Sequence, residues 1–186
     1  LALRTTTDST IIWNAASHTT TIRFFKNSGT AFWNQNDSRV VSGPSPGVPF
    51  GGVGGITRVW NVATGAEIFK LGSNNNQSFN DANQQNAVNL TMSPEWSSDG
   101  NRLLLLHISG TATANTNNTM TRAEVYEGAS WQRILSVSMA NSNATIAHFS
   151  PDNAMILMAE STLEVRNAST GALLKTMPVN STINSA

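Results

Sequence analysis

The densest group of reactive side chains lies in the segment IAHFSPD, where His148, Ser150 and Asp152 are the residue types of a hydrolytic triad. All three fall within one expected strand and the turn after it. Alternation along a strand sends His148 and Ser150 to the same face, and the segment supplies no site for an oxyanion. We therefore expect structural roles for these residues and predict no catalytic residue in the chain.

Metal and cofactor chemistry has little support. None of His18, His107 and His148 has a second histidine or a carboxylate at the spacing of metal ligands. The chain contains no cysteine, which excludes disulfides and cysteine-based metal sites. The run GGVGG at 51–55 lacks the Lys-Ser/Thr of a phosphate-binding loop. We expect no metal and no cofactor.

Five tryptophans could form a stacking platform for bases or sugars. Four of them recur at equivalent positions of repeated segments, which favours packing between repeats: Trp13, Trp33, Trp60 and Trp96. Trp131 is the exception, because it lies in the turn GASWQR. Trp131 is therefore the candidate for an exposed contact with a partner.

The elements that must position these residues repeat along the chain. IIWNAASHTTTIRFF from Ile11, RVWNVATGAEIFKL from Arg58 and LEVRNASTGALLKTM from Leu163 each contain an alternating apolar run, an Asn, a Thr/Ser/Gly turn and a second alternating run. AEVYEGASWQRILSV from Ala123 has the same form, with Glu127 in place of the Asn. This pattern predicts β-hairpins, which cannot bury a face alone and must stack on similar units.

A second kind of hairpin precedes three of these segments. WNQNDSRVVSG from Trp33, WSSDGNRLLLL from Trp96 and FSPDNAMILMA from Phe149 share an aromatic residue, an Asp or Asn three residues later in a polar turn, and a strand-forming run. An inner and an outer hairpin together make a four-stranded unit. The sequence thus predicts an all-β fold of the β-propeller class, as an incomplete propeller or fragment of about three and a half blades.

The expected organisation is a single propeller domain over residues 1–186. A partial blade covers 1–25, and three blades lie near 30–71, 87–139 and 144–178. Because the chain begins at Leu1 inside an expected strand, without an initiator Met, we expect a fragment or an excised domain.

Three polar stretches are expected to be loops between these elements. GPSPGVPFGGVG at 43–54 and GTATANTNNTM at 110–120 would emerge on one face of the propeller. GSNNNQSFNDANQQN at 72–86 would join two blades on the opposite face.

Charge limits the classes of partner. Charged residues make up 12% of the chain and the net charge is zero, whereas about 25% is typical. Strong nonspecific binding to nucleic acid is not expected, since it depends on the neutralisation of phosphates. No apolar run approaches the roughly 20 residues that span a bilayer, and nothing resembles a signal peptide. We expect protein partners, no membrane association and a cytoplasmic location.

Glycosylation signals offer an alternative. The pattern Asn-x-Ser/Thr occurs at Asn36, Asn76, Asn89, Asn117, Asn143, Asn167 and Asn180. A chain so rich in Asn, Ser and Thr produces nearly this many by composition alone, and Asn36 and Asn167 fall in tight turns that favour Asn. A surface or secreted propeller for adhesion or carbohydrate binding remains an alternative.

The hairpins resemble divergent WD40-type repeats. RVWNVATGAEIFKL resembles the closing strands of that family, with Asn61 in place of its usual Asp, and FSPDN resembles its inner turn FSPDG. The Gly-His dipeptide of strict WD40 repeats is missing. A narrower resemblance, over roughly residues 30–160, is to the propellers of eukaryotic translation initiation factor 2A and of the b subunit of initiation factor 3. It is carried by RVWNVATG, SPEWSSDGNRL, AEVYEGASWQRIL and IAHFSPDNAMIL in that order.

This resemblance implies a non-catalytic scaffold that docks on the small ribosomal subunit or on other initiation factors. It carries over no catalytic residue, and it places contacts in the segments 43–54 and 110–120 and in exposed Arg or Lys of the blades. A propeller enzyme is the least favoured alternative. Its acids and histidines would have to converge from the innermost strands, where only Glu95 and His148 are available.

Overall fold

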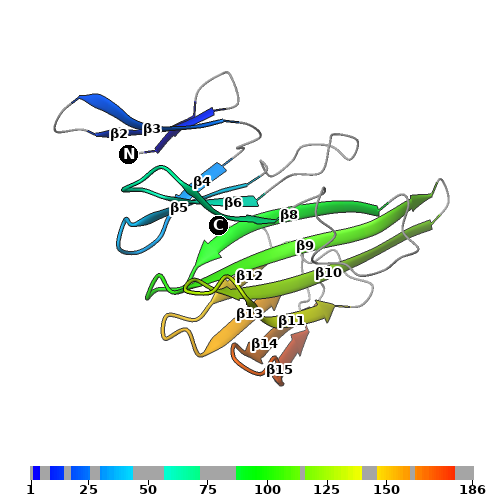
Figure 1. Cartoon of the computed structure of the whole chain (residues 1–186). Coiled ribbons are helices and arrows are strands. Elements are labelled where there is room, and N and C mark those ends of the chain that lie inside the picture. Colours follow the sequence, from blue (N-terminus) through cyan, green and yellow to red (C-terminus); the bar gives the residue numbers. More distant parts are fainter. Residues whose placement is uncertain are drawn as a thin grey trace. The chain divides into compact units, whose positions relative to one another are not determined.

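The computed structural model describes residues 2–4, 9–14, 18–25, 30–43, 57–71, 87–113, 116–139, 146–159 and 162–178. These ranges form strands and turns and contain no helix. The chain divides into two compact units, Leu1–Ala82 and Asn83–Ala186. Each unit holds two antiparallel sheets, in which strands consecutive in sequence lie side by side (Figure 1).

The first unit contains a three-stranded and a four-stranded sheet. The smaller sheet consists of β1 (Ala2–Arg4), β2 (Ser9–Asn14) and β3 (Thr19–Phe25). The larger sheet consists of β4 (Thr30–Trp33), β5 (Arg39–Gly43), β6 (Thr57–Asn61) and β7 (Glu67–Leu71).

The second unit contains two four-stranded sheets. The first consists of β8 (Ala87–Trp96), β9 (Arg102–Thr113), β10 (Thr116–Glu127) and β11 (Arg133–Met139). The second consists of β12 (Ile146–Phe149), β13 (Met155–Ala159), β14 (Thr162–Asn167) and β15 (Leu173–Pro178).

The outer hairpin of every sheet has the same irregularity. The strand register shifts at one point, and one residue of the last strand is left without an opposite residue: Thr21, Ile68, Ile134 and Leu174. Among the described residues, each turn before this shift has a residue with left-handed backbone: His18 (φ 54°), Gly65 (73°), Trp131 (57°) and Gly171 (73°). These shared features define equivalent positions in the four hairpins.

The Asn of these turns acts as a hydrogen-bond acceptor. Asn61 Oδ1 accepts from the amide of Thr64 at 3.0 Å, and Asn167 Oδ1 accepts from the amides of Ser169 and Thr170 at 2.9 Å each. The side chain thus satisfies turn amides that no strand can pair. The positive φ falls four residues later, so Asn is favoured here for its hydrogen bonds rather than for its backbone.

The inner turns also share one design. The residue predicted as the turn former accepts from a backbone amide two residues on: Asn36 from Ser38 at 3.2 Å, Asp99 from Asn101 at 3.0 Å, and Asp152 from Ala154 at 3.0 Å. Serine hydroxyls donate to both acids, Ser97 to Asp99 and Ser150 to Asp152. These hydrogen bonds, those of the hydroxyls first, lower the pKa of Asp99 and of Asp152.

The core of the second unit lies between its two sheets. We call face A the side of β8–β11 that carries Leu104, Leu106, Ala123, Val125, Leu135 and Val137, and face B the opposite side. Face A packs against Ala147, Ile156, Met158 and Ala168 of the sheet β12–β15. Gly171 permits this approach, because a Cβ there would lie 2.9 Å from Leu135 Cδ1. Equivalent positions define the faces of the other sheets, so Ile156 lies on face B of β12–β15.

The core of the first unit follows the same rule. Ile12, on face A of β1–β3, packs with Val40, on face B of β4–β7. Trp33 and Trp60 lie opposite Val40 in the register and join this cluster, together with Ala31 and Val62. The prediction that Trp33 and Trp60 pack between repeats is confirmed.

One expected loop is a hairpin instead. Residues 110–120 were expected to be irregular, but the described part of this segment, 110–113 and 116–120, belongs to β9 and β10, which pair from Arg102–Glu127 out to Thr113–Thr116. Alternating Thr and Asn can extend a strand ladder once a neighbouring strand satisfies the backbone, which composition alone does not reveal. The expected loop at 72–86 and most of that at 43–54 lie outside the described residues.

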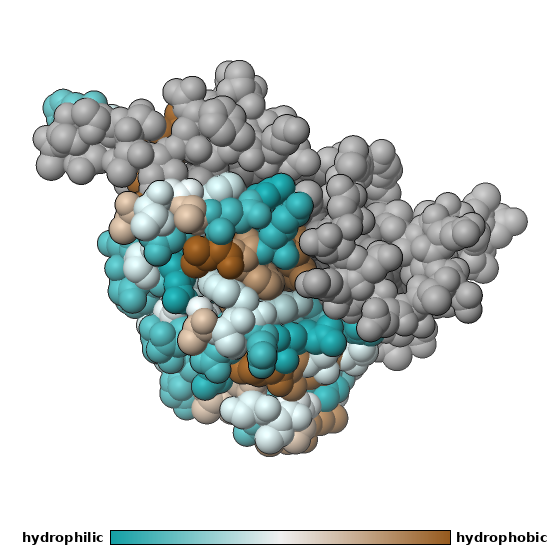
Figure 2. Space-filling view, viewed as in Figure 1, coloured by the Kyte–Doolittle hydropathy of each residue, from teal (hydrophilic) through white to brown (hydrophobic). Residues whose placement is uncertain are grey.

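Charged residues make up 12% of the chain. Figure 2 shows hydrophilic and neutral residues on the face in view, with small separate hydrophobic areas. Across the part of the chain that the structure describes, no helix is long and apolar enough to cross a membrane.

Candidate interaction site

Four side chains form a cross-strand row at the end of the sheet β8–β11. The register aligns Trp96 of β8, Leu103 of β9, Tyr126 of β10 and Arg133 of β11. Directly opposed residues point to the same face, so the row lies on face B. It stands next to the turn that carries Trp131.

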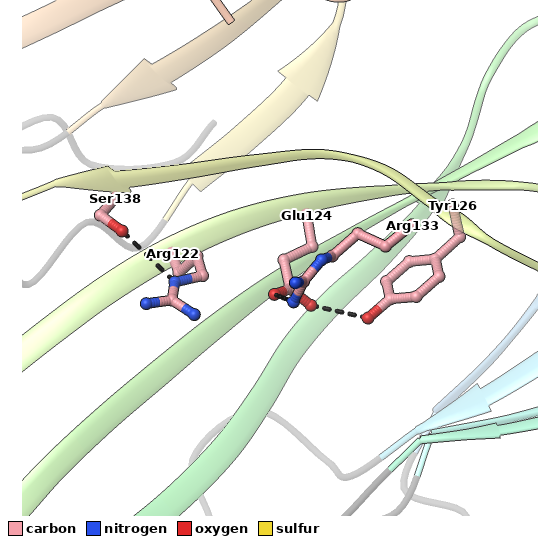
Figure 3. Close-up of polar contacts among 5 residues, drawn as sticks. All are labelled: Arg122, Glu124, Tyr126, Arg133 and Ser138. Atoms are coloured by element: carbon pink, nitrogen blue, oxygen red, sulfur yellow. Dashed lines mark hydrogen bonds and ion pairs between the residues drawn. The ribbon is translucent and has the colours of Figure 1, made fainter. Parts of the chain in front are cut away.

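Glu124 is the centre of a polar cluster on this face (Figure 3). Its side chain is 0% exposed. Oε1 accepts from Arg133 Nη1 at 2.7 Å, and Oε2 accepts from the Tyr126 hydroxyl at 2.7 Å. Two steps along β10, Arg122 Nε donates to Ser138 Oγ at 3.3 Å. A buried carboxylate is tolerated only when it is paired and hydrogen-bonded, and Glu124 meets both conditions.

The cluster changes the acidity of Tyr126. Burial, followed by the negative charge of Glu124 and the hydrogen bond to it, raises the pKa of the phenol above its ordinary value. Tyr126 therefore stays a neutral donor across the physiological range. The arrangement fixes the end of β10 and the start of β11, which flank the outer turn.

Trp131 occupies the left-handed position of that turn. Its amide donates to the carbonyl of Glu127 at 2.7 Å. Its ring meets Trp96 edge to face, with centroids 6.2 Å apart and an interplanar angle of 69°. Trp131 is half-buried, because the T-shaped pair covers part of the ring. The role of Trp131 as a partner contact stays a prediction.

A second aromatic residue stands at this position of another sheet. His18 also has left-handed backbone, and its ring stacks on Trp13 at 5.4 Å and 24°. The other two sheets have Gly65 and Gly171 there. Left-handed backbone costs a non-glycine residue about 1–2 kcal/mol. The aromatic contacts offset this strain at His18 and Trp131.

Glu95 and His148, the two innermost-strand candidates, come together in the second unit. A bulge at Ser93 and buried Pro94 interrupts the pairing of β8 with β9 just before Glu95. Glu95 Oε2 contacts His148 Nδ1 at 2.5 Å, and Oε1 accepts from the Phe149 amide at 3.0 Å. Both carboxylate oxygens are thus used to join the innermost strands of the two sheets.

The triad residue types are not assembled into a triad. Ser150 donates its hydroxyl to Asp152 Oδ1 at 2.5 Å, whereas His148 contacts Glu95. The adjacent turns are also joined: Ser98 Oγ donates to the carbonyl of Pro151 at 2.9 Å, and the Ser98 amide donates to Asn153 Oδ1 at 2.9 Å. These groups hold the two sheets in register at the turn end.

The remaining candidates from the sequence are His107, the glycine-rich run and possible metal ligands. His107 lies in β9, and GGVGG at 51–55 lies outside the described residues. No group of three or more His, Cys, Asp or Glu side chains that could hold a metal occurs within the described ranges. Sequence reasoning missed Glu124. Its signal was an acid enclosed by the apolar residues Ala123 and Val125 of β10, on the same strand face as Tyr126.

The site combines the edge-to-face pair of Trp96 and Trp131 with the ion pair of Glu124 and Arg133. Its polar groups satisfy one another, and its aromatic groups are fixed by a bulge, a strained turn and a buried ion pair. Rigid aromatic residues beside an Arg are the residue types enriched at protein interfaces.

Comparisons with known proteins address the fold. No protein-family model and no curated protein sequence matches this chain. Among solved structures the chain is similar to one described as the crystal structure of the eukaryotic initiation factor, with a TM-score of 0.55 and 14% sequence identity. The match covers 83% of this chain and 33% of that chain, so this chain spans about a third of the matched protein. The likeness confirms the expected fold class: the sheets are blades of an all-β, β-propeller fold.

Proposed function

We propose that this chain is a non-catalytic β-propeller scaffold for protein–protein interaction, with translation initiation as its context and the cytoplasm as its location. The observation that carries the proposal is the structural likeness to a eukaryotic initiation factor over 83% of the chain. The motif order shared with initiation-factor propellers and with WD40-type repeats supports it. The neutral charge favours protein partners, among them initiation factors or proteins of the small ribosomal subunit.

Trp131 supplies the contact that this function requires. A tryptophan at a position that needs left-handed backbone carries a cost that Gly65 and Gly171 avoid. Strained residues that persist in a fold are candidates for functional ones. The half-buried ring of Trp131, held against Trp96, fits the aromatic anchor of a partner interface.

The test compares Trp131→Gly with the wild type in co-sedimentation with 40S particles and in binding to purified initiation factors. Glycine relieves about 1–2 kcal/mol of backbone strain, and loss of the aromatic pair costs about 0.5–1.5 kcal/mol. Stability should therefore change little, while binding falls about tenfold or more, as for an interface anchor. His18→Gly is the matched control, with the same backbone change and unchanged binding expected.

Each outcome has a distinct meaning. Absence of the wild-type chain from ribosomal fractions and from all factor complexes contradicts the translation context. Binding that survives Trp131→Gly places the contact elsewhere. A secreted, carbohydrate-binding propeller would instead be indicated by a mobility shift of native material after enzymatic deglycosylation.

A further inference from the structure

Four turns of the second unit lie together at one end of its two sheets. The Gly128 amide donates to the carbonyl of Asn101 at 2.7 Å, which joins the outer and inner turns of β8–β11. The Ala168 amide donates to the carbonyl of Ala154 at 2.9 Å, which joins those of β12–β15. The hydrogen bonds of Ser98 join the two inner turns to each other. We call this connected surface the turn end, and it consists of residues 97–101, 127–132, 150–154 and 168–172.

The turn end carries negative charge only. Three of its residues are acidic, Asp99, Glu127 and Asp152, and none is Lys, Arg or His. All three acids are exposed. Hydrogen bonds, first those from Ser97 and Ser150, lower the pKa of Asp99 and of Asp152, so both are ionised at neutral pH. Because the whole chain has a net charge of zero, the residues outside the turn end carry the balancing positive excess.

The arginines that flank the turn end do not cancel this charge. Arg133 is paired with Glu124, and Arg166 is paired with Glu164. Arg102, at the start of β9, offsets at most one of the three acids. The turn end therefore keeps a net negative charge.

The three acids are spread over the surface rather than gathered at one point. Asp99 and Asp152 lie in the inner turns of two different sheets, and Glu127 is the last residue of β10. Within the described ranges no group of three or more His, Cys, Asp or Glu side chains could hold a metal. Separate carboxylates suit a polypeptide that carries several cations along its length, rather than a single ion.

Trp131 adds an aromatic ring to this surface. It lies in the same turn as Glu127, whose carbonyl accepts from its amide, and its half-buried ring is held against Trp96. The face of a tryptophan ring attracts cations, and the planar guanidinium of Arg also stacks on it. A tryptophan in the same turn as an acid therefore fits an Arg side chain better than any other.

We propose that the turn end docks a basic, arginine-containing segment of a protein partner, with one Arg on the Trp131 ring and further cations beside Asp99 and Asp152. The proposal rests on the function proposed above, in which Trp131 contacts a partner, and it names the chemistry of that partner. Charge complementarity identifies the occupant, since opposite potentials guide association and disfavour partners of like charge. Nucleic acid does not fit, because three carboxylates would face its phosphates.

The probe is a fluorescent peptide of alternating Arg and Ser, and its anisotropy with the full chain measures binding at low and at high salt. The wild-type chain should bind the peptide at low salt, and the affinity should fall as salt screens the exposed charges. A peptide with Lys in place of Arg should bind several-fold more weakly, because an ammonium does not stack as a guanidinium does. A peptide with Glu in place of Arg should not bind.

Variants of the chain locate the binding surface. Glu127→Gln should weaken binding about threefold, as expected for one exposed ion pair. The triple variant with Asp99→Asn, Glu127→Gln and Asp152→Asn keeps the acceptor oxygens of the turns and should weaken binding about tenfold or more. Trp131→Gly should weaken it about tenfold through loss of the cation–π contact. Thr176→Lys is the matched control: it lies exposed in β15, outside the turn end, changes the net charge as much as Glu127→Gln does, and should leave binding unchanged.

Three results would overturn the proposal, once far-UV circular dichroism has shown that each variant keeps its strands. The wild-type chain could fail to bind the Arg peptide at low salt. It could bind the Glu peptide equally well. The triple variant could bind the Arg peptide as the wild type does.

Failure of the proposed function gives a different pattern. Binding of the Arg peptide, with the wild-type chain absent from ribosomal fractions and factor complexes, would contradict the translation context and support the basic occupant. A factor complex that survives both the triple change and high salt would leave the scaffold function standing and overturn the basic occupant.

Discussion

The sheets β4–β7 and β8–β11 each have an ion pair at equivalent positions, but the acid and the base are exchanged between the two sheets. In the first, Arg58 pairs with Glu67; in the second, Glu124 pairs with Arg133. The positions are equivalent, because Glu67 lies opposite Trp60 and Arg133 lies opposite Tyr126, next to the same register shift. In these two hairpins a diagonal ion pair joins the neighbouring strands, and its polarity is reversed between them.

The two pairs differ in how well they are satisfied. Glu124 is 0% exposed and has a partner for each oxygen. Glu67 is 30% exposed, and Arg58 has a buried Nε without a hydrogen-bond partner among the described residues. Loss of a partner should therefore cost much more in β10–β11, where the remaining charge cannot reach water, than in β6–β7.

Arg133→Ala should have the largest effect. It leaves the carboxylate of Glu124 buried without the Arg133 ion pair, which should lower the free energy of unfolding by about 3 kcal/mol, at the lower end for a broken buried pair. Arg58→Ala, the matched change in β6–β7, should cost about 1 kcal/mol or less, since Glu67 remains solvated. Urea denaturation measures both. Equal losses would contradict the contrast between the two pairs.

Reversing the pair tests whether polarity matters. Glu124→Arg combined with Arg133→Glu gives β10–β11 the charges of β6–β7. The double change should lower the free energy of unfolding by about 2 kcal/mol, which is less than the sum of the two single changes because the residues are coupled neighbours. Part of the loss remains because the Tyr126 hydroxyl no longer has its carboxylate acceptor. A loss of stability equal to the sum of the single changes would show that the environment of the pair fixes its polarity.

Tyr126→Phe isolates the second hydrogen bond of Glu124. It should cost about 1.5 kcal/mol, as expected for a buried hydrogen bond to a charged group. The raised pKa of Tyr126 means that the folded protein holds the phenolic proton more tightly than the unfolded chain, whose tyrosine ionises near pH ~10. This stabilisation is complete below that pH and is lost as the pH rises further.

The chain contains a single tyrosine, so its ultraviolet absorbance reports this ionisation directly. In the folded protein the phenolate should appear only at a pH well above that seen in urea. Ionisation at the same pH in both states would contradict the buried contact with Glu124.

The comparison also shows what the sequence could and could not predict. The repeated turns were predictable because Asn36, Asp99 and Asp152 form local hydrogen bonds within a few residues. The ion pairs were not, because a pair such as Glu124 and Arg133 depends on a register shift that moves one strand by one residue. The contact between Glu95 and His148 joins two sheets, and the two residues are 53 positions apart in the sequence. Only the packing of the two sheets brings them together.

Trp131 illustrates a partial success. Its place in a turn and its departure from the repeat were visible in GASWQR, but its contact with Trp96 was not. The left-handed backbone of Trp131 could have been expected by aligning it with Gly65 and Gly171. The extended hairpin of β9 and β10 was misjudged for a different reason, since polar composition does not prevent pairing with a neighbouring strand.

The smallest expected effect concerns the inner turns, where the same two sheets differ again. Asn36 forms the turn of β4–β5 and Asp99 forms that of β8–β9. Asp99→Asn keeps the acceptor oxygen but removes the charge, so at neutral pH it should cost about 0.5 kcal/mol or less in this exposed turn. The pKa of Asp99 is lowered in the folded state, chiefly by the Ser97 hydroxyl. Its contribution is therefore present above the unfolded value of about 3.9 and is lost as the pH falls through the lower folded value.

The sharper measurement is thus the acid limb of the stability curve, which is the fall of the free energy of unfolding as the pH decreases. Urea denaturation at successive pH values measures it. Asp99→Asn should flatten that limb relative to the wild type, and Asp152→Asn should do the same in the neighbouring sheet, because Ser150 lowers the pKa of Asp152 in the same way. Asn36→Asp should introduce an acid limb where β4–β5 has none from this position. An unchanged limb in all three variants would mean that the charge in the turn is irrelevant to folding, and that Asp and Asn serve there only as acceptors.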